Sequence, residues 1–371
     1  MPVTLTTLCD LATLGFDDII DVRSPAEFAE DHLPGAISLP VMSDAERAEI
    51  GTLYKQVSPF LARKRGAALV ARHAADHLEG PLADRNGAWK PLVYCWRGGQ
   101  RSGSFASILS QIGWRVDTVA GGYKAWRALV VSALYDTPMP CPVVVLDGNT
   151  GSAKTEVLNL LPGLGVQVLD LEGLARHRGS LFGAMPGGQP SQKAFEGALA
   201  RQIAALDPSR PVVVEAESSK IGECRVPPEL WKAMTVAPRV TIAAPRDARA
   251  DYLQRAYADM VEDPERLAGV IGQLRHGHAH DLIEAWLALA ATGQHRALAD
   301  GLMLHHYDPR YSRHRDRMQG RLVEVAAPTL AAGALPALAQ SVAAAVQQAA
   351  AAVQQAAAAV QPIARENRSD L

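Results

Sequence analysis

The alternation of apolar and polar residues predicts two α/β units along this chain of 371 residues. In residues 1–130, short apolar runs predict strands, and stretches with helical periodicity separate them. The strands are expected at residues 19–22, 92–94 and 115–119, and the helices at residues 44–51, 65–78 and 102–112. This strand–helix rhythm is typical of a mostly parallel sheet covered by helices.

A second unit begins after residues 131–142, a segment rich in proline that we interpret as a linker. Apolar runs predict buried strands at residues 143–147, 166–170 and 211–219, and residues 247–300 have a helical pattern. The fold class is therefore α/β, with a parallel-sheet domain at residues 1–130. A second α/β domain with a helical C-terminal part covers residues 143–330.

The last segment, residues 331–371, is rich in alanine and repeats valine at Val346, Val353 and Val360. Alanine favours a helix, and valine every seven residues would form a narrow stripe suited to a weak coiled coil. We favour the simpler hypothesis that this tail is a dispensable low-complexity extension.

Composition excludes several classes of protein. The hydrophobic content of 48% suffices for sizeable cores, and the net charge of −2 means that a nucleic-acid site would have to be a local patch. The four cysteines lie far apart, which argues against a disulfide framework and a zinc site. No signal peptide and no membrane-spanning run is apparent, so we expect a soluble protein of a reducing cytoplasm.

The strongest candidate for chemistry is the loop that follows the predicted strand at residues 92–94. Cys95 begins it, Gly98 and Gly99 let it curl, and five residues separate Cys95 from Arg101. Backbone N–H groups, the start of the next helix, Arg97 and Arg101 would together hold an anion and favour the thiolate of Cys95. We predict Cys95, Arg97 and Arg101 as catalytic residues.

A Cys-x5-Arg loop serves either phosphate-ester hydrolysis or the transport of sulfur or selenium on cysteine. Three flanking stretches resemble the motifs of a rhodanese domain, and they favour chalcogen transfer. These stretches are Asp21-Val22-Arg23-Ser24-Pro25-Ala26-Glu27-Phe28, His32-Leu33-Pro34-Gly35-Ala36-Ile37 and Gly121-Gly122-Tyr123-Lys124-Ala125-Trp126.

A second candidate site follows the strand at residues 143–147 and resembles the phosphate-binding P-loop of nucleotide hydrolases. Its residues are Gly148, Asn149, Thr150, Gly151, Ser152, Ala153, Lys154 and Thr155. Ala153 replaces the second glycine of the motif, and alanine is strained there if the position needs a positive φ. This departure weakens the case for ordinary ATP or GTP turnover more than the case for phosphate binding.

Glu215 and Glu217 follow a strand and point to one face, so we predict them as acids near the phosphate site. We expect no metal site in the protein itself, although Mg²⁺ bound with the phosphates is compatible with this arrangement. We expect no tightly bound cofactor.

A basic segment at residues 305–317 combines arginines with tyrosines, a composition suited to RNA backbone contact and base stacking. A solvated basic helix face is the alternative. The predicted tRNA-binding residues are Arg310, Arg313, Arg315, Arg317, Tyr307 and Tyr311.

Taken together, the motifs resemble bacterial tRNA 2-selenouridine synthases over roughly residues 5–325. The likeness rests on residues 94–102 and 148–155, on Leu169-Asp170-Leu171-Glu172-Gly173-Leu174-Ala175, His177-Arg178-Gly179-Ser180, Val214-Glu215-Ala216-Glu217-Ser218-Ser219-Lys220-Ile221-Gly222 and His306-Tyr307-Asp308-Pro309.

This resemblance implies a two-step change of the wobble uridine in tRNAs for lysine, glutamate and glutamine. The 2-thio sulfur is first alkylated by geranyl diphosphate, and selenium from selenophosphate then replaces the S-geranyl group. Both compounds are co-substrates, and an enzyme that supplies selenophosphate is a possible partner. From the phosphate chemistry we assign the diphosphate to residues 148–155 and the selenium transfer to Cys95.

Two other functions stay open on sequence alone. One is a thiosulfate sulfurtransferase or Cys-x5-Arg phosphatase fused to a nucleotide kinase. The other is a non-catalytic adaptor that relays sulfur or binds RNA.

Overall fold

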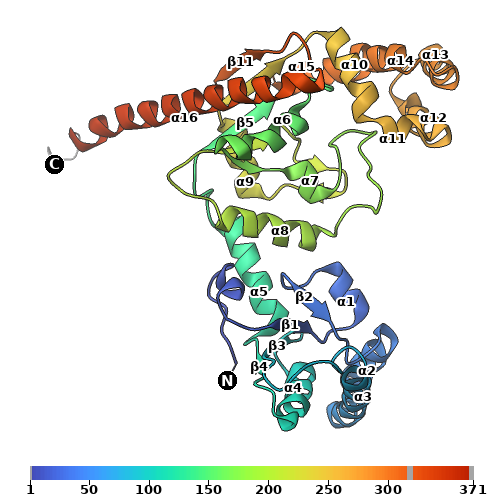
Figure 1. The fold of residues 1–371 in the computed structure, drawn as a ribbon, viewed down its shortest axis with the longest axis vertical. Helices are drawn as coiled ribbons and strands as arrows, with labels where there is room; N and C mark the ends of the chain where they lie inside the picture. Colours follow the sequence, from blue (N-terminus) through green and yellow to red (C-terminus); the bar gives the residue numbers. More distant parts are fainter. Residues whose placement is uncertain (1, 316–320, 367–371) are drawn as a thin grey trace. The chain divides into compact units, whose positions relative to one another are not determined.

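The computed structural model describes residues 2–315 and 321–366, and the chain divides into two compact units (Figure 1). The first unit contains Met1–Thr137 and Pro190–Ala205, and the second contains Pro138–Gln189 and Leu206–Leu371. Arg317 of the predicted tRNA-binding set lies outside the described residues.

The described part of the first unit has a four-stranded parallel sheet in the order β2-β1-β3-β4. Its strands are β1 (Asp18–Asp21), β2 (Ala36–Ser38), β3 (Pro91–Tyr94) and β4 (Asp117–Thr118). Its helices are α1 (Pro25–Glu30), α2 (Asp44–Gln56), α3 (Pro59–Glu79), α4 (Gln100–Ile112), α5 (Gly122–Val131) and α8 (Gln192–Ala204). The predicted parallel sheet is confirmed, and β3 lies between β1 and β4 with all of its side chains buried.

The helices are longer than the sequence pattern predicts, since α2 extends to Gln56, α3 begins at Pro59 and α4 begins at Gln100. At α2, the Ser43 side chain accepts a hydrogen bond from the Glu46 backbone N–H, and the Glu46 side chain accepts one in return. At the predicted linker, α5 continues into a π-helical turn, Ser132–Asp136, since the prolines begin only at Pro138.

Helix α8 belongs to the first unit although its sequence falls inside the second. Its Glu196 is buried, forms an ion pair with Arg127 and accepts a hydrogen bond from the Tyr135 hydroxyl at 2.6 Å. Lys193 also pairs with Glu30 at 2.6 Å. A buried carboxylate needs such partners, and only the first unit provides them here. Residues 190–205 are therefore an insertion that returns the chain to its first unit.

The second unit has a sheet of five parallel strands in its described residues, in the order β11-β10-β5-β7-β6. These strands are β5 (Val143–Asp147), β6 (Gln167–Leu169), β7 (Val212–Glu215), β10 (Arg239–Ala243) and β11 (Leu322–Ala326), and a small hairpin joins β8 (Lys220–Ile221) to β9 (Cys224–Arg225). Its helices are α6 (Lys154–Leu160), α7 (Leu171–Ala175), α9 (Pro228–Val236), α10 (Arg246–Ala256), α11 (Ala258–Val261), α12 (Pro264–Gln273), α13 (His280–Ala291), α14 (His295–Leu302), α15 (Asp308–Arg315) and α16 (Leu335–Glu366).

The alanine-rich segment is not a loose appendage, which corrects the expectation that it is dispensable. Helix α16 packs along the sheet of the second unit, and its Leu338, Val342 and Val346 are buried in the same core as β5 and β10 (Figure 1). Small alanines at Ala339, Ala345, Ala349 and Ala350 let the helix approach the sheet closely. None of the described helices, α16 included, combines the length and apolar character needed to cross a membrane.

Arg176 directly follows the last residue of α7 and adopts the left-handed conformation, with φ 48° and ψ 48°. A residue with a Cβ atom is strained there by about 1–2 kcal/mol, whereas glycine is not. Because glycine also loses about 0.5–1 kcal/mol of chain entropy, we expect Arg176→Gly to stabilise the second unit by about 0.5–1 kcal/mol.

Urea unfolding of the full chain measures this gain, and Arg176→Ala is the matched control. The alanine variant removes the same exposed side chain but keeps the strained backbone. Equal stabilities of the two variants would contradict the expectation.

Candidate functional site

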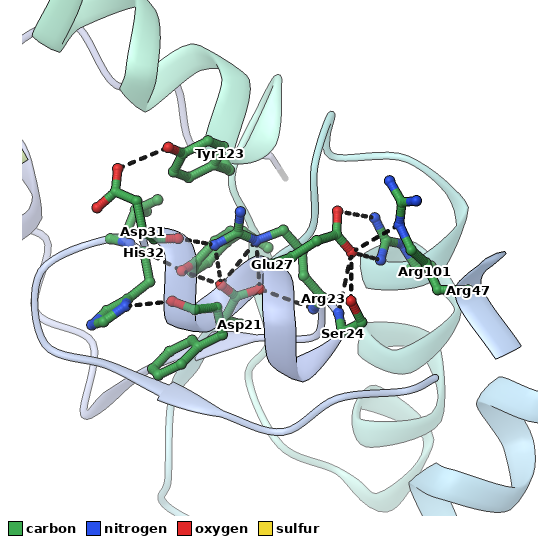
Figure 2. Close-up of polar contacts among 12 residues, drawn as sticks. Asp21, Arg23, Ser24, Glu27, Asp31, His32, Arg47, Arg101 and Tyr123 are labelled. Atoms are coloured by element: carbon green, nitrogen blue, oxygen red, sulfur yellow. Dashed lines mark hydrogen bonds and ion pairs between the residues drawn. The ribbon is translucent and has the colours of Figure 1, made fainter. Parts of the chain in front are cut away.

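A buried polar network around Asp21 and Arg23 (Figure 2) fixes the end of β3, where the Cys95 loop begins. The Arg23 guanidinium forms an ion pair with Asp21 at 2.6 Å, and both side chains are fully buried. The Tyr94 hydroxyl donates a hydrogen bond to Asp21 at 2.7 Å, and Arg23 donates to the Asp31 carbonyl at 2.5 Å. The guanidinium also lies 4.2 Å from the Tyr123 ring centroid. These rhodanese-like motif residues therefore position the loop and do not face a ligand.

Two glycines allow the Cys95 loop to pack against the start of α5. A Cβ atom on Gly98 would lie 2.5 Å from the Val119 carbonyl oxygen, and one on Gly122 would lie 2.2 Å from the Cys95 carbonyl oxygen. Both glycines also have positive φ. Tyr123 and Lys124 then donate backbone hydrogen bonds to Cys95 and Trp96, at 2.9 and 3.0 Å, so the loop backbone is fixed.

Cys95 is buried, and its Sγ accepts a hydrogen bond from the Ser102 hydroxyl at 3.2 Å. Helix α4 begins directly after Gly99, which has no side chain to cap the first N–H groups of the helix. These N–H groups have no partner within the helix and stay available for an anion near the sulfur. The site thus has the geometry expected of a nucleophile beside an anion cradle.

The two loop arginines differ in their surroundings. Arg97 is exposed, and among the described residues its side chain has no ion pair or hydrogen bond. Arg101 pairs with Glu27 at 2.7 Å. Burial works to raise the pKa of Glu27, but the hydrogen bond and charge of Arg101 outweigh it and lower this pKa to about 2. The charge of Arg101 is therefore balanced by Glu27, which also fixes its side chain. Arg97 is the more accessible positive charge of the loop.

Beside this loop lies a cavity of about 810 Å³ between α2, α3 and α4. Cationic side chains from all three helices line it: Arg47, Lys55, Arg63 and Arg101. Sequence reasoning missed the first three, because they lie on ordinary amphipathic helices and meet only in the folded unit.

The phosphate-binding loop has the predicted strand–loop–helix form, since β5 ends at Asp147 and α6 begins at Lys154. Ala153 caps α6 with φ 59°, so the position does require the left-handed conformation. The Lys154 ammonium donates to the Gly148 carbonyl at 2.8 Å and lies 5.5 Å from the Tyr311 ring centroid. Burial works to lower the pKa of Lys154, but Tyr311 and carboxylates such as Glu172 outweigh it and raise it.

Three glutamates gather beside the loop. Glu172 accepts a hydrogen bond from the Thr155 hydroxyl at 2.9 Å, and its backbone N–H donates to Glu215 at 3.3 Å. Glu215 and Glu217 are buried, and this burial together with repulsion from Glu172 raises their pKa values well above the usual range. The predicted acids thus lie beside the loop and favour the protonated state. Within the described residues, no group of three or more His, Cys, Asp or Glu side chains is arranged to hold a metal ion.

The His306-Tyr307-Asp308 segment supports the phosphate loop. Asp308 forms two hydrogen bonds with Arg249, at 2.9 and 2.8 Å, and Arg249 donates to the Thr150 carbonyl at 3.0 Å. Sequence reasoning missed this role of Asp308 and Arg249, which are far apart in the chain.

Three of the predicted tRNA-binding residues have described side chains, and these three lie in different surroundings. Tyr311 lines the phosphate cavity of about 360 Å³, Tyr307 lines a neighbouring apolar pocket, and Arg310 donates to His306 at 2.6 Å. Arg313 and Arg315 lie on α15, but their side chains are outside what the structure describes. The two tyrosines thus line cavities of the second unit, and tRNA binding by the tyrosines and by the arginines stays a prediction.

Comparisons with known proteins agree with both halves of this architecture. The family model described as "tRNA 2-selenouridine synthase AAA domain" matches residues 141–268, and the rhodanese-like domain model matches residues 8–129. A relative from Aeromonas salmonicida, named tRNA 2-selenouridine synthase, is 36% identical over 81% of this chain and 89% of its own length. One of the same name from Pseudomonas syringae pv. tomato is 34% identical over 84% of this chain and 93% of its own.

Proposed function

Because this chain belongs to the tRNA 2-selenouridine synthase family, we propose that its two sites catalyse successive steps at a 2-thiouridine of tRNA. The first step is S-geranylation by geranyl diphosphate at the phosphate loop. The second is replacement of the S-geranyl group by selenium from selenophosphate, with Cys95 as the reactive side chain. One observation carries this proposal: the chain contains both the Cys95 loop, which can hold an anion beside a thiol, and the phosphate loop of residues 148–155.

In the first step, the thiocarbonyl sulfur attacks C1 of geranyl diphosphate. A carbon–sulfur bond forms, the C1–oxygen bond breaks, and diphosphate leaves while the ring nitrogen N3 loses its proton. Lys154 stays charged in its buried position and stabilises the developing charge on the diphosphate. Glu172, which accepts a hydrogen bond from the Thr155 hydroxyl at 2.9 Å beside the loop, can accept the released proton.

In the second step, a carbon–selenium bond forms while the carbon–sulfur and phosphorus–selenium bonds break. Water supplies the oxygen of the phosphate product and the protons, so geranylthiol and phosphate leave and no oxidant is needed. Arg97 and the first N–H groups of α4 can hold the selenophosphate anion, and Arg101 keeps the loop in place through Glu27.

Nucleosides of tRNA from a strain that lacks this gene test the proposal. The selenated wobble nucleoside is expected to disappear and to return when the intact gene is restored. Unchanged selenated nucleoside in the deletion strain would favour an unrelated sulfurtransferase or adaptor function.

Replacing Lys154 with alanine should weaken geranylation specifically. The change removes a charge-assisted contact worth about 1.5–3 kcal/mol, which corresponds to a loss of about 10- to 100-fold in kcat/KM. Selenation of tRNA that already carries the S-geranyl group should change much less, because that step uses the other site.

Steady-state kinetics of both steps measures this difference, with Lys232→Ala as the control for loss of an exposed lysine. Unchanged geranylation by the Lys154 variant would mean that the diphosphate binds elsewhere.

A further inference from the structure

The phosphate cavity opens beside a second, apolar pocket in the second unit. Thr150, Leu253 and Tyr257 line both cavities, so the two share a wall. The apolar pocket is about 80 Å³ and lies among helices α10, α11, α12 and α14, which gather beside α15 (Figure 1). Its wall contains side chains such as Met260, Val261, Leu298, Ala299 and Leu302.

Helix α10 connects the pocket to the phosphate loop directly. A Cβ atom on Gly151 would lie 2.9 Å from Leu253 Cγ, so the leucine side chain packs against the loop backbone. One turn earlier, Arg249 holds the Thr150 carbonyl at 3.0 Å. The same helix therefore fixes the phosphate loop and places an apolar side chain at the entrance of the pocket.

Tyr257 marks the boundary between the polar and apolar spaces. Its hydroxyl lies 3.3 Å from the Ser180 hydroxyl, and its ring lies 4.8 Å from the Arg178 guanidinium. Ser180 and Arg178 line the phosphate cavity and not the apolar pocket. A ligand that bridges the two spaces would have a charged phosphate end and an apolar end.

We propose that this apolar pocket binds the distal isoprene unit of the prenyl diphosphate, while the proximal unit lies in the shared entrance and the diphosphate lies on the phosphate loop. This inference rests on the proposed geranylation step and adds the part of the site that selects chain length. The alternative is a packing gap in the core of the helical part, because Met260, Leu298 and Leu302 are buried there.

The test compares prenyl diphosphates of different length in a pocket-filling variant. Ala299→Phe places a ring in the pocket, and Ala297→Phe on the same helix is the matched control, because Ala297 is exposed and does not line the pocket. Kinetics of tRNA S-alkylation is measured for the full chain with geranyl diphosphate (C10) and dimethylallyl diphosphate (C5).

Filling the pocket should raise the KM for geranyl diphosphate by at least about tenfold. A substrate that is one methylene group too large or too small for an apolar pocket already shows an effect of this size. The C5 substrate ends before the pocket, so its KM should change by less than about threefold. The Ala297 variant should keep the wild-type values for both. Equal affinity for inorganic diphosphate in all three proteins confirms that the phosphate loop is folded.

An unchanged KM for geranyl diphosphate in Ala299→Phe would overturn the proposal and leave the pocket as a packing gap. If the wild-type protein does not alkylate tRNA with any of the prenyl diphosphates tested, the proposed function fails. In that case, equilibrium binding tests the pocket. The proposal is still supported if the wild-type protein binds geranyl diphosphate more tightly than inorganic diphosphate and Ala299→Phe loses this difference. Equal binding of the two compounds by the wild-type protein would overturn it.

If Ala299→Phe does not fold, Val261→Ala provides the opposite change, since it widens the pocket by two carbon atoms. The ratio of kcat/KM for farnesyl diphosphate (C15) to that for geranyl diphosphate should then rise by about tenfold. An unchanged ratio would overturn the proposal.

Discussion

Replacement of Cys95 by serine is expected to abolish selenation of tRNA, while S-geranylated tRNA still forms and accumulates. Serine preserves the volume of the buried side chain and can accept the hydrogen bond from Ser102 that Cys95 Sγ accepts at 3.2 Å. It lacks a thiolate, which is the soft nucleophile that selenium chemistry needs. Loss of an essential nucleophile lowers kcat by about a thousandfold or more.

Mass spectrometry of the modified nucleosides measures both products in one sample. Cys9→Ser is the matched control, since Cys9 is exposed and belongs to neither site. Normal selenation by the Cys95 variant would end the assignment of this residue. Loss of geranylation together with selenation would show that the two steps are not separable in this way.

Truncation after Pro336 is expected to prevent stable folding of the second unit, whereas truncation after Ala352 is not. The shorter protein loses Leu338, Val342 and Val346 from the core that α16 forms with the sheet. Each large buried aliphatic side chain contributes about 2–5 kcal/mol, whereas whole domains are stable by only about 5–15 kcal/mol. Together these losses are comparable to the full stability of the unit.

Thermal unfolding followed by circular dichroism tests both truncations. The protein that ends at Ala352 keeps Ala349 and Ala350, the last buried residues described in α16, so its unfolding should resemble that of the full chain. If the protein that ends at Pro336 unfolds cooperatively at the same temperature, α16 contributes nothing and the tail is dispensable after all.

The strands that carry chemistry were predictable from sequence. β3, β5 and β7 are short, mainly apolar runs: β3 ends directly before Cys95, β5 ends directly before Gly148, and β7 ends at Glu215. Burial on both faces of a parallel sheet requires such apolar runs. Strand β10 contains Arg239 and Thr241, so its apolar run is interrupted, and we did not predict it from the sequence.

Other features depend on contacts between distant segments and have no local signal. The heptad of valines in α16 suggested a weak coiled coil, but the small alanines beside them serve close packing on a sheet. Asp308 lies in the segment for which RNA contact stays a prediction, and it holds Arg249 and, through it, the Thr150 carbonyl. Composition alone does not distinguish such internal ion pairs from an exposed basic surface.

The most direct test of the two-step account is a time course with purified full-length protein, a tRNA that carries 2-thiouridine, geranyl diphosphate and selenophosphate. Mass spectrometry of the wobble nucleoside should show the S-geranyl form rising first and then declining as the selenated form appears. Without geranyl diphosphate, neither product should form. Selenated nucleoside that forms at the same rate without geranyl diphosphate would contradict the account.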